Sequence, residues 1–116
     1  MFPVPADFDQ LFNSAIQDNL YLKVIHQINK DFSLANESID LDIDIAPDDL
    51  KTQLHNKVYR LIQYKFAEYL NLLYIVDVAE DEIKRLDGSD IVELSRQVSF
   101  LILKREWMKV WFRNKY

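Results

Sequence analysis

Apolar residues keep helical spacing without interruption from Leu50 to Val76, and this run constrains the fold more than any other feature. Side chains three or four positions apart share one face of an α-helix, so the run predicts a long amphipathic helix. Pro47, followed by Asp48 and Asp49, is typical of a helix start, because proline fits the first turn and acids favour the positive end of the helix dipole. The run consists of Leu50, Leu54, Val58, Leu61, Ile62, Phe66, Tyr69, Leu70, Leu73 and Val76.

A single helix over 47–86 is too long for a domain of this size. At 1.5 Å per residue it would measure about 58 Å, whereas a domain of 116 residues has a radius of gyration of about 13 Å. We therefore expect a break at Asp77–Glu80, which has the Asp-x-x-Glu pattern of a capping box, and a short helix over about 78–86. Gly88, the only glycine, is expected to end this helix in the left-handed conformation that glycine tolerates best.

Capping residues also predict the remaining helices. Asp7 and Gln10 form a second capping box, which opens a helix over 8–17, and the apolar stripe then moves to another face over 19–33. Ser89 or Asp90 is expected to cap a last helix that runs to about 112. Its segment 98–103 is apolar on almost every side, as in a buried central helix. The predicted fold class is all-α, a single domain over 1–116 built as a bundle of four or five helices.

One segment, 38–45, has the pattern of a strand instead. Ile39, Leu41, Ile43 and Ile45 alternate with acidic or polar residues, which would place the four apolar side chains on one face of an extended chain. The segment could lie extended across the helices or pair with the same segment of a second copy. The alternative fold, α+β, pairs 38–45 with a strand over 72–78. We favour helix there, because the helical period continues through that region.

The composition excludes several classes of active site. The chain has no cysteine and one glycine, which excludes thiolate sites and the glycine-rich phosphate and nucleophile motifs. The row Asp40, Asp42 and Asp44 fails as a calcium loop, because the glycine and glutamate positions hold Ile45 and Lys51. His26 and His55 are isolated, and no Glu-x-x-His motif is present. We predict no metal, no cofactor and no enzymatic activity; Glu68, Glu93 and Glu106 could converge as an acid–base pair, but the sequence cannot place them.

Charge is divided unevenly along the chain. Residues 1–56 hold ten acids and three bases, whereas residues 96–116 hold six bases and one acid. The two ends could lie against each other in the fold, which is the interpretation we favour, or the basic end could face a nucleic acid or a membrane. The net charge of −5 argues against a general nucleic-acid binder, since such proteins depend on neutralising phosphates.

The segment 104–116 combines aromatic and basic residues. Trp107 and Trp111 lie on one helical face with Leu103, and Arg105, Lys109, Phe112 and Arg113 lie among them. Such a mixture is found where single-stranded nucleic acids stack on a protein and at the centres of protein interfaces. The interpretation we favour is that both tryptophans pack against the bundle while the bases stay in water.

These features predict a small cytoplasmic protein without enzymatic activity that binds a protein partner or a second copy of itself. The chain shows no secretory signal and no apolar stretch long enough to span a membrane. Two alternatives stay open: an acidic inhibitor or immunity-type protein that binds a basic partner, and a nucleic-acid-binding protein that uses its C-terminal helix. The candidate interaction residues are Ile39, Leu41, Ile43, Ile45, Arg105, Trp107, Lys109, Trp111, Phe112 and Arg113.

Overall fold

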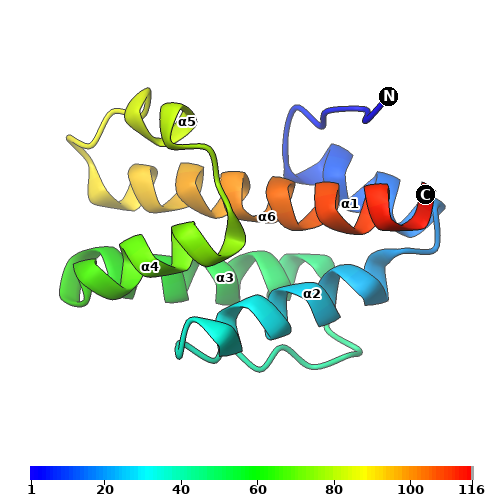
Figure 1. The fold of residues 1–116 in the computed structure, drawn as a ribbon, viewed down its shortest axis with the longest axis horizontal. Coiled ribbons are helices and arrows are strands. Elements are labelled where there is room, and N and C mark those ends of the chain that lie inside the picture. Colours follow the sequence, from blue (N-terminus) through cyan, green and yellow to red (C-terminus); the bar gives the residue numbers. More distant parts are fainter. Residues whose placement is uncertain (116) are drawn as a thin grey trace.

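The computed structural model describes residues 1–115, and this part of the chain forms six α-helices without a strand (Figure 1). The all-α prediction is therefore confirmed, and the α+β alternative, with strands at 38–45 and 72–78, is wrong. The described residues form six helices, one more than the upper limit of the predicted four or five. The helices are α1 (Phe8–Gln17), α2 (Tyr21–Leu34), α3 (Pro47–Tyr64), α4 (Phe66–Val76), α5 (Glu80–Lys84) and α6 (Ile91–Lys115).

Three helix starts follow the predicted capping. Asp7 Oδ1 accepts a hydrogen bond from Gln10 N at 2.9 Å, and Gln10 Oε1 accepts one from Ala6 N at 2.8 Å, one residue before the N–H that a standard capping box uses. Pro47 occupies the first turn of α3, and Asp90 Oδ1 accepts from Val92 N at 3.0 Å at the start of α6. These starts depend on neighbouring residues alone, which is why the sequence locates them.

The additional helix arises from a break at Lys65 that the apolar spacing does not reveal. Lys65 has φ −140° and ψ 60°, outside the helical region, and the chain reverses there so that α4 returns along α3 (Figure 1). A straight helix over 47–76 would be about 45 Å long, and the longest dimension of the molecule is 35 Å. The break keeps the apolar faces of both helices inside one core.

Two predictions around α5 are wrong. Asp77 does not cap α5; it ends α4 in the left-handed conformation, with φ 70°, and Ala79 is the N-cap of α5. Gly88 does not have positive φ. Helix α5 already ends at Lys84 with Arg85 as its C-cap, so Gly88 lies too far along the chain to be the residue that follows the cap. The turn before α6 is held by Asp87 instead, whose Oδ1 accepts from Ser89 N at 2.9 Å.

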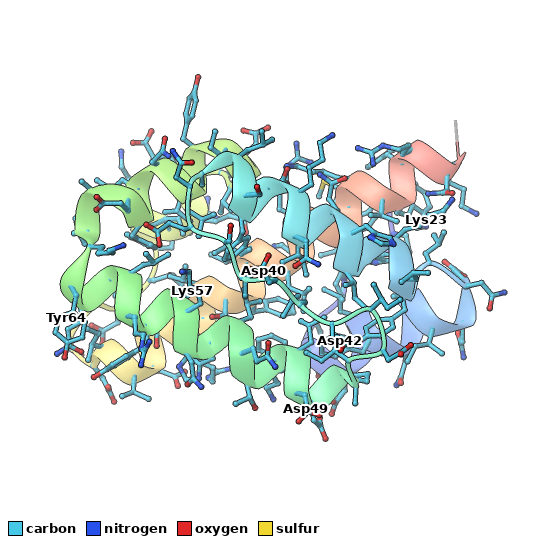
Figure 2. The ribbon with its side chains drawn as sticks, turned by 90° about the horizontal axis from the view of Figure 1, so that it is seen from below. Lys23, Asp40, Asp42, Asp49, Lys57 and Tyr64 are labelled. Atoms are coloured by element: carbon cyan, nitrogen blue, oxygen red, sulfur yellow. The ribbon has the colours of Figure 1, made fainter. Side chains whose placement is uncertain are left out.

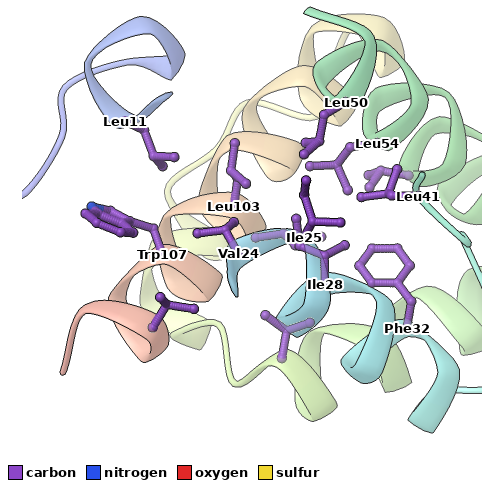
Figure 3. Close-up of a cluster of buried hydrophobic side chains, with 14 of the residues drawn as sticks. Leu11, Val24, Ile25, Ile28, Phe32, Leu41, Leu50, Leu54, Leu103 and Trp107 are labelled. Atoms are coloured by element: carbon purple, nitrogen blue, oxygen red, sulfur yellow. The ribbon is translucent and has the colours of Figure 1, made fainter. Parts of the chain in front are cut away.

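Helix α6 lies at the centre of the bundle and packs against α1, α2, α3 and α4, as its apolar circumference predicts. Figure 3 shows side chains of α1, α2, α3 and α6 meeting in one core, together with Leu41 from the segment between α2 and α3. The core residues with no exposed surface include Leu11, Ile25, Ile28, Phe32, Leu50, Leu54, Leu72, Ile102, Leu103 and Trp107.

The segment 38–45 is neither a strand nor the expected extended segment: Asp40 is in the left-handed region, with φ 50°, and the segment crosses the helices as an irregular loop. Asn29 of α2 holds it: its Oδ1 accepts from Leu41 N at 2.8 Å, and its Nδ2 donates to Leu41 O at 3.0 Å. Asp42 then turns the chain, because its Oδ1 accepts from Asp44 N and its carbonyl accepts from Ile45 N. The predicted single apolar face is therefore interrupted: Leu41 and Ile45 are buried, Ile39 is partly buried, and Ile43 is 58% exposed.

Candidate functional site

Both tryptophans of the C-terminal helix lie in the core. Trp107 is fully buried, and Trp111 is covered by Phe2, with an edge-to-face contact of 5.6 Å between ring centroids. Phe112 stacks on Phe2 at 6.0 Å and is 40% exposed. The N-terminal segment thus covers the aromatic face that a nucleic-acid or partner interface would use. Tyr116, the last residue of the candidate segment 104–116, lies outside the described residues.

The basic residues among these tryptophans bind other parts of the bundle. Arg105 Nη2 lies 2.9 Å from Asp77 Oδ2, which fixes the end of α4 to α6. Lys109 Nζ lies 2.8 Å from Asp31 Oδ2, and Arg113 Nη1 donates to Gln27 Oε1 at 2.9 Å. Within residues 1–115, Lys109 and Asp31 form the one ion pair between the acidic half of the chain and its basic end. The two ends therefore lie against each other, but only one ion pair among the described residues joins them.

A pair of carboxyl groups, Asp31 of α2 and Glu106 of α6, lies beside Lys109. Glu106 has no exposed surface, and neither of its oxygens accepts a hydrogen bond from a nitrogen donor, although Oε1 lies 3.5 Å from Lys109 Nζ. Burial, helped by the hydrogen bond and charge of Asp31, raises the pKa of Glu106 to about 10. Glu106 is therefore protonated at neutral pH, beside the charged Asp31 carboxylate.

Asp31 titrates in the opposite direction. Burial by itself would raise its pKa, but hydrogen bonds from Glu106, Lys109 and Gln27 outweigh burial and lower the pKa below the ordinary aspartate value. The pair therefore holds one proton and one negative charge, which Lys109 balances. Because Glu106 is fully buried, this pair links α2 to α6 in the interior and does not face a substrate. Glu68 and Glu93, which the sequence left open as carboxylates that could converge with Glu106, are not part of it.

A second buried acid, Glu37, holds the corner between α3 and α4. Its two oxygens lie 3.2 Å from Lys57 Nζ and 3.3 Å from Lys65 Nζ. Burial alone would raise the pKa of Glu37, but the hydrogen bonds and charges of the two lysines outweigh it and lower that pKa. The Lys65 break is therefore tied to the segment that follows α2.

The outer face of α4 exposes three large apolar side chains. Phe66, Leu70 and Tyr74, which we call the α4 stripe, follow each other at helical spacing and are 56%, 51% and 81% exposed. The opposite face of α4 packs against α2, α3 and α6 through Tyr69, Leu72 and Val76. Glu68 is the only charged residue within α4, so the helix is apolar on both sides.

A pocket of about 510 Å³ continues the stripe toward α5. Its lining is mainly apolar and comes from the C-terminal half of α4 and from α5: Leu70, Leu73, Tyr74, Asp77, Val78, Glu80, Ile83 and Lys84. The helical spacing put both Phe66 and Leu70 on one stripe with the core residues, and Tyr74 was not among the candidate interaction residues. The sequence feature that could have indicated this surface is the apolar composition of α4 on every side. Such a helix is either buried on all sides within its own chain or covered on one side by a binding partner.

Comparison with known proteins adds no functional information, because no protein-family model, no curated protein and no solved structure matches this chain. None of the helices described in residues 1–115 has an apolar stretch long enough to cross a membrane. In the same residues, no three histidine, aspartate or glutamate side chains converge so as to hold a metal ion.

Proposed function

We propose that this chain is a protein-interaction module that forms a homodimer through the α4 stripe. The observation that carries the proposal is the exposure of Phe66, Leu70 and Tyr74 on a helix whose other face is already packed into the core. An apolar surface of this kind on a helix is typical of a binding face, because its contact with water is unfavourable. The proposal includes the expectations that the protein is cytoplasmic and has no catalytic activity.

A second copy of the chain is the partner that the stripe fits. The stripe has an aromatic residue on each side of Leu70, so the order of its side chains is the same in both directions along the helix. A two-fold axis near Leu70 with antiparallel α4 helices would place Leu70 against its counterpart and Phe66 against Tyr74 of the second copy. Two-fold interfaces use the same patch on both copies, and paired aromatic rings add to the free energy of apolar burial.

A stable interface buries about 800 Å² on each partner, which is more than three side chains supply. Val78 and Ile83 of the neighbouring pocket would have to contribute.

Sedimentation velocity over a concentration series tests the proposal with a matched pair of variants. Leu70→Lys introduces a charge into the stripe, whereas Ile16→Lys introduces the same charge at a residue of nearly equal exposure, 49%, on α1. We expect the wild-type chain and Ile16→Lys to dimerise and Leu70→Lys to stay monomeric. A wild-type monomer at high micromolar concentration would contradict the proposal. A dimer lost in Ile43→Lys but kept in Leu70→Lys would move the interface to 38–45 and contradict the α4 site.

The second candidate function is an acidic protein that binds a basic partner, and the exposed aspartates before α3 and in its first turn favour it. Asp40, Asp42, Asp44, Asp48 and Asp49 are all exposed, and none forms an ion pair within the described residues (Figure 2). Such a row would speed association with a positive surface. Replacing Asp42, Asp44 and Asp49 by asparagine should weaken binding to poly-lysine at low salt more than replacing Glu80, Asp81 and Asp87 by the matching amides. Equal weakening would contradict this candidate.

A further inference from the structure

A concave pocket of about 420 Å³ lies between α2 and the C-terminal part of α6, on a surface separate from the α4 stripe. Its volume falls in the range of roughly 300–1,000 Å³ that small-molecule sites occupy. Figure 2 shows Lys23, one of its lining residues, on α2 beside the C-terminal end of α6. The α2–α6 pocket is lined by Lys23, His26, Gln27, Lys30, Val110, Arg113 and Asn114.

The lining of the α2–α6 pocket is cationic in an acidic chain. Among residues 1–115, this lining contains two lysines, one arginine and one histidine, and no carboxylate, although the chain has 19 acids and 14 bases. Among the described residues, neither Lys30 nor His26 forms a hydrogen bond or an ion pair, and the partner of Lys23 is the neutral Asn114, at 2.6 Å from Nζ to Oδ1. The positive charge of the pocket is therefore not neutralised by its own lining.

A buried side chain fixes the position of the arginine in this pocket. Arg113 Nη1 donates to Oε1 of Gln27, which is only 5% exposed. The amide of Gln27 is itself oriented, because its Nε2 donates to Asp31 Oδ1 at 3.1 Å. The chain of contacts from Asp31 through Gln27 to Arg113 holds one guanidinium nitrogen and leaves the other donors of Arg113 for a ligand. A group held in place in this way loses less entropy when a ligand binds.

We propose that the α2–α6 pocket binds the phosphate group of a phosphate monoester. Arginine matches phosphate geometry with paired N–H donors, and Lys23 and Lys30 supply two further charges at the same concave surface. A compact dianion enters the local positive field without meeting the acids elsewhere on the chain, whereas an extended polyanion such as nucleic acid would meet them. The phosphate could belong to a soluble metabolite or to a lipid headgroup, and we propose the soluble form.

Phenyl phosphate is the probe for this proposal, followed by ¹H–¹⁵N NMR of the full chain at low salt. We expect saturable shifts of the backbone amides of Lys23, His26, Lys30, Arg113 and Asn114. Arg113→Gln and Lys30→Gln should each weaken binding, Arg113→Gln by about tenfold or more, since a charged hydrogen bond contributes about 1.5–3 kcal/mol. Lys30 is exposed and forms no hydrogen bond or ion pair within the described residues, so its variant tests the site with little effect on folding.

The matched control is Arg96→Gln, which removes an exposed arginine of α6 that pairs with Glu93 outside the pocket. It should leave the affinity for phenyl phosphate unchanged. Equal weakening by Arg96→Gln and Arg113→Gln would show general charge attraction and overturn the site. Absence of saturable shifts in the wild-type chain at millimolar phenyl phosphate would also overturn it, as would binding to phosphatidate-containing vesicles without binding to phenyl phosphate. None of these outcomes depends on the α4 stripe.

Discussion

Lys109 of α6 binds Asp31 of α2 across 78 positions of sequence, with 2.8 Å between Nζ and Oδ2. Both side chains are largely buried, and the contact joins the central helix to the acidic half of the chain. Because Glu106 is protonated, the two neighbouring carboxyl groups carry one negative charge and not two. The contact therefore combines an ion pair with a neighbouring protonated carboxyl group, and its members can be tested separately.

Lys109→Met should destabilise the protein by about 3 kcal/mol, because it leaves the Asp31 carboxylate buried without its cation. Lys104→Met is the control: Lys104 is a lysine of the same helix with nearly the same exposure, but its partner Glu82 is 36% exposed, so the loss should stay below about 1 kcal/mol. Urea unfolding at pH 7 measures both. Equal losses for the two variants would show that Lys109 has no special role.

Glu106→Gln should remove a dependence of stability on pH. The folded-state pKa of Glu106, about 10, is above its ordinary value of 4.5, so the folded chain binds the proton more tightly than the unfolded chain. The wild-type free energy of unfolding should therefore fall as pH rises from about 4.5 to about 10, by ~1.4 kcal/mol per pH unit.

Urea unfolding of the wild type and of Glu106→Gln between pH 6 and 9 isolates this effect, because groups common to both proteins cancel in the difference. Glutamine keeps the shape of the protonated carboxyl and a donor toward Asp31, so the variant should be relatively more stable at the alkaline end. Parallel curves for the two proteins would mean that Glu106 is already ionised in the folded state.

Asn29→Ala should loosen the segment 38–45 without unfolding the bundle. The substitution removes two hydrogen bonds to the backbone of Leu41, and we expect a loss of about 1–3 kcal/mol. Hydrogen exchange at the Leu41 amide should accelerate more than exchange in α6. Asn56→Ala, at an exposed position of α3, should change neither quantity. Unchanged exchange at Leu41 would indicate that burial of Leu41 and Ile45 alone fixes the segment.

Phe2→Ala should expose the indole of Trp111. The Phe2 ring covers that indole at 5.6 Å and is itself 8% exposed, so its removal should destabilise the chain by about 2–4 kcal/mol and shift tryptophan fluorescence to longer wavelength. Val4→Ala, at an exposed position of the same segment, is the control. An unshifted spectrum in Phe2→Ala would mean that the N-terminal segment does not cover α6 in solution.

Most of the secondary structure follows from local signals, and the exceptions follow from contacts between distant segments. Asp7, Pro47 and Asp90 act on residues within a few positions of themselves, so the sequence locates the starts of α1, α3 and α6. Lys65 has no such signal, because aromatic residues with good helical spacing flank it on both sides. Its break depends on the size of the core and on the salt bridge to Glu37, and neither is visible in a local pattern.

The candidate surfaces could be predicted only in part for the same reason. The spacing of Leu103, Trp107 and Trp111 indicates one apolar face, and the structure places both tryptophans in the core. For the α4 stripe the spacing was not sufficient, because the adjacent residues Tyr69 and Leu70 both fit the apolar period, yet Tyr69 is buried and Leu70 is exposed. Which side meets the core depends on where α2, α3 and α6 lie. The pairing of Asp31 with Glu106 likewise requires the placement of α2 against α6.

The indole nitrogen of Trp107 has a consequence for experiment. Its N–H is buried without an acceptor, so no hydrogen bond protects it and only the exclusion of water does. Exchange of this single proton with deuterium therefore reports how often the interior opens to solvent, separately from the backbone bonds that protect the amides around it. The exchange rate of the Trp107 indole proton is thus a direct probe of transient opening of the core.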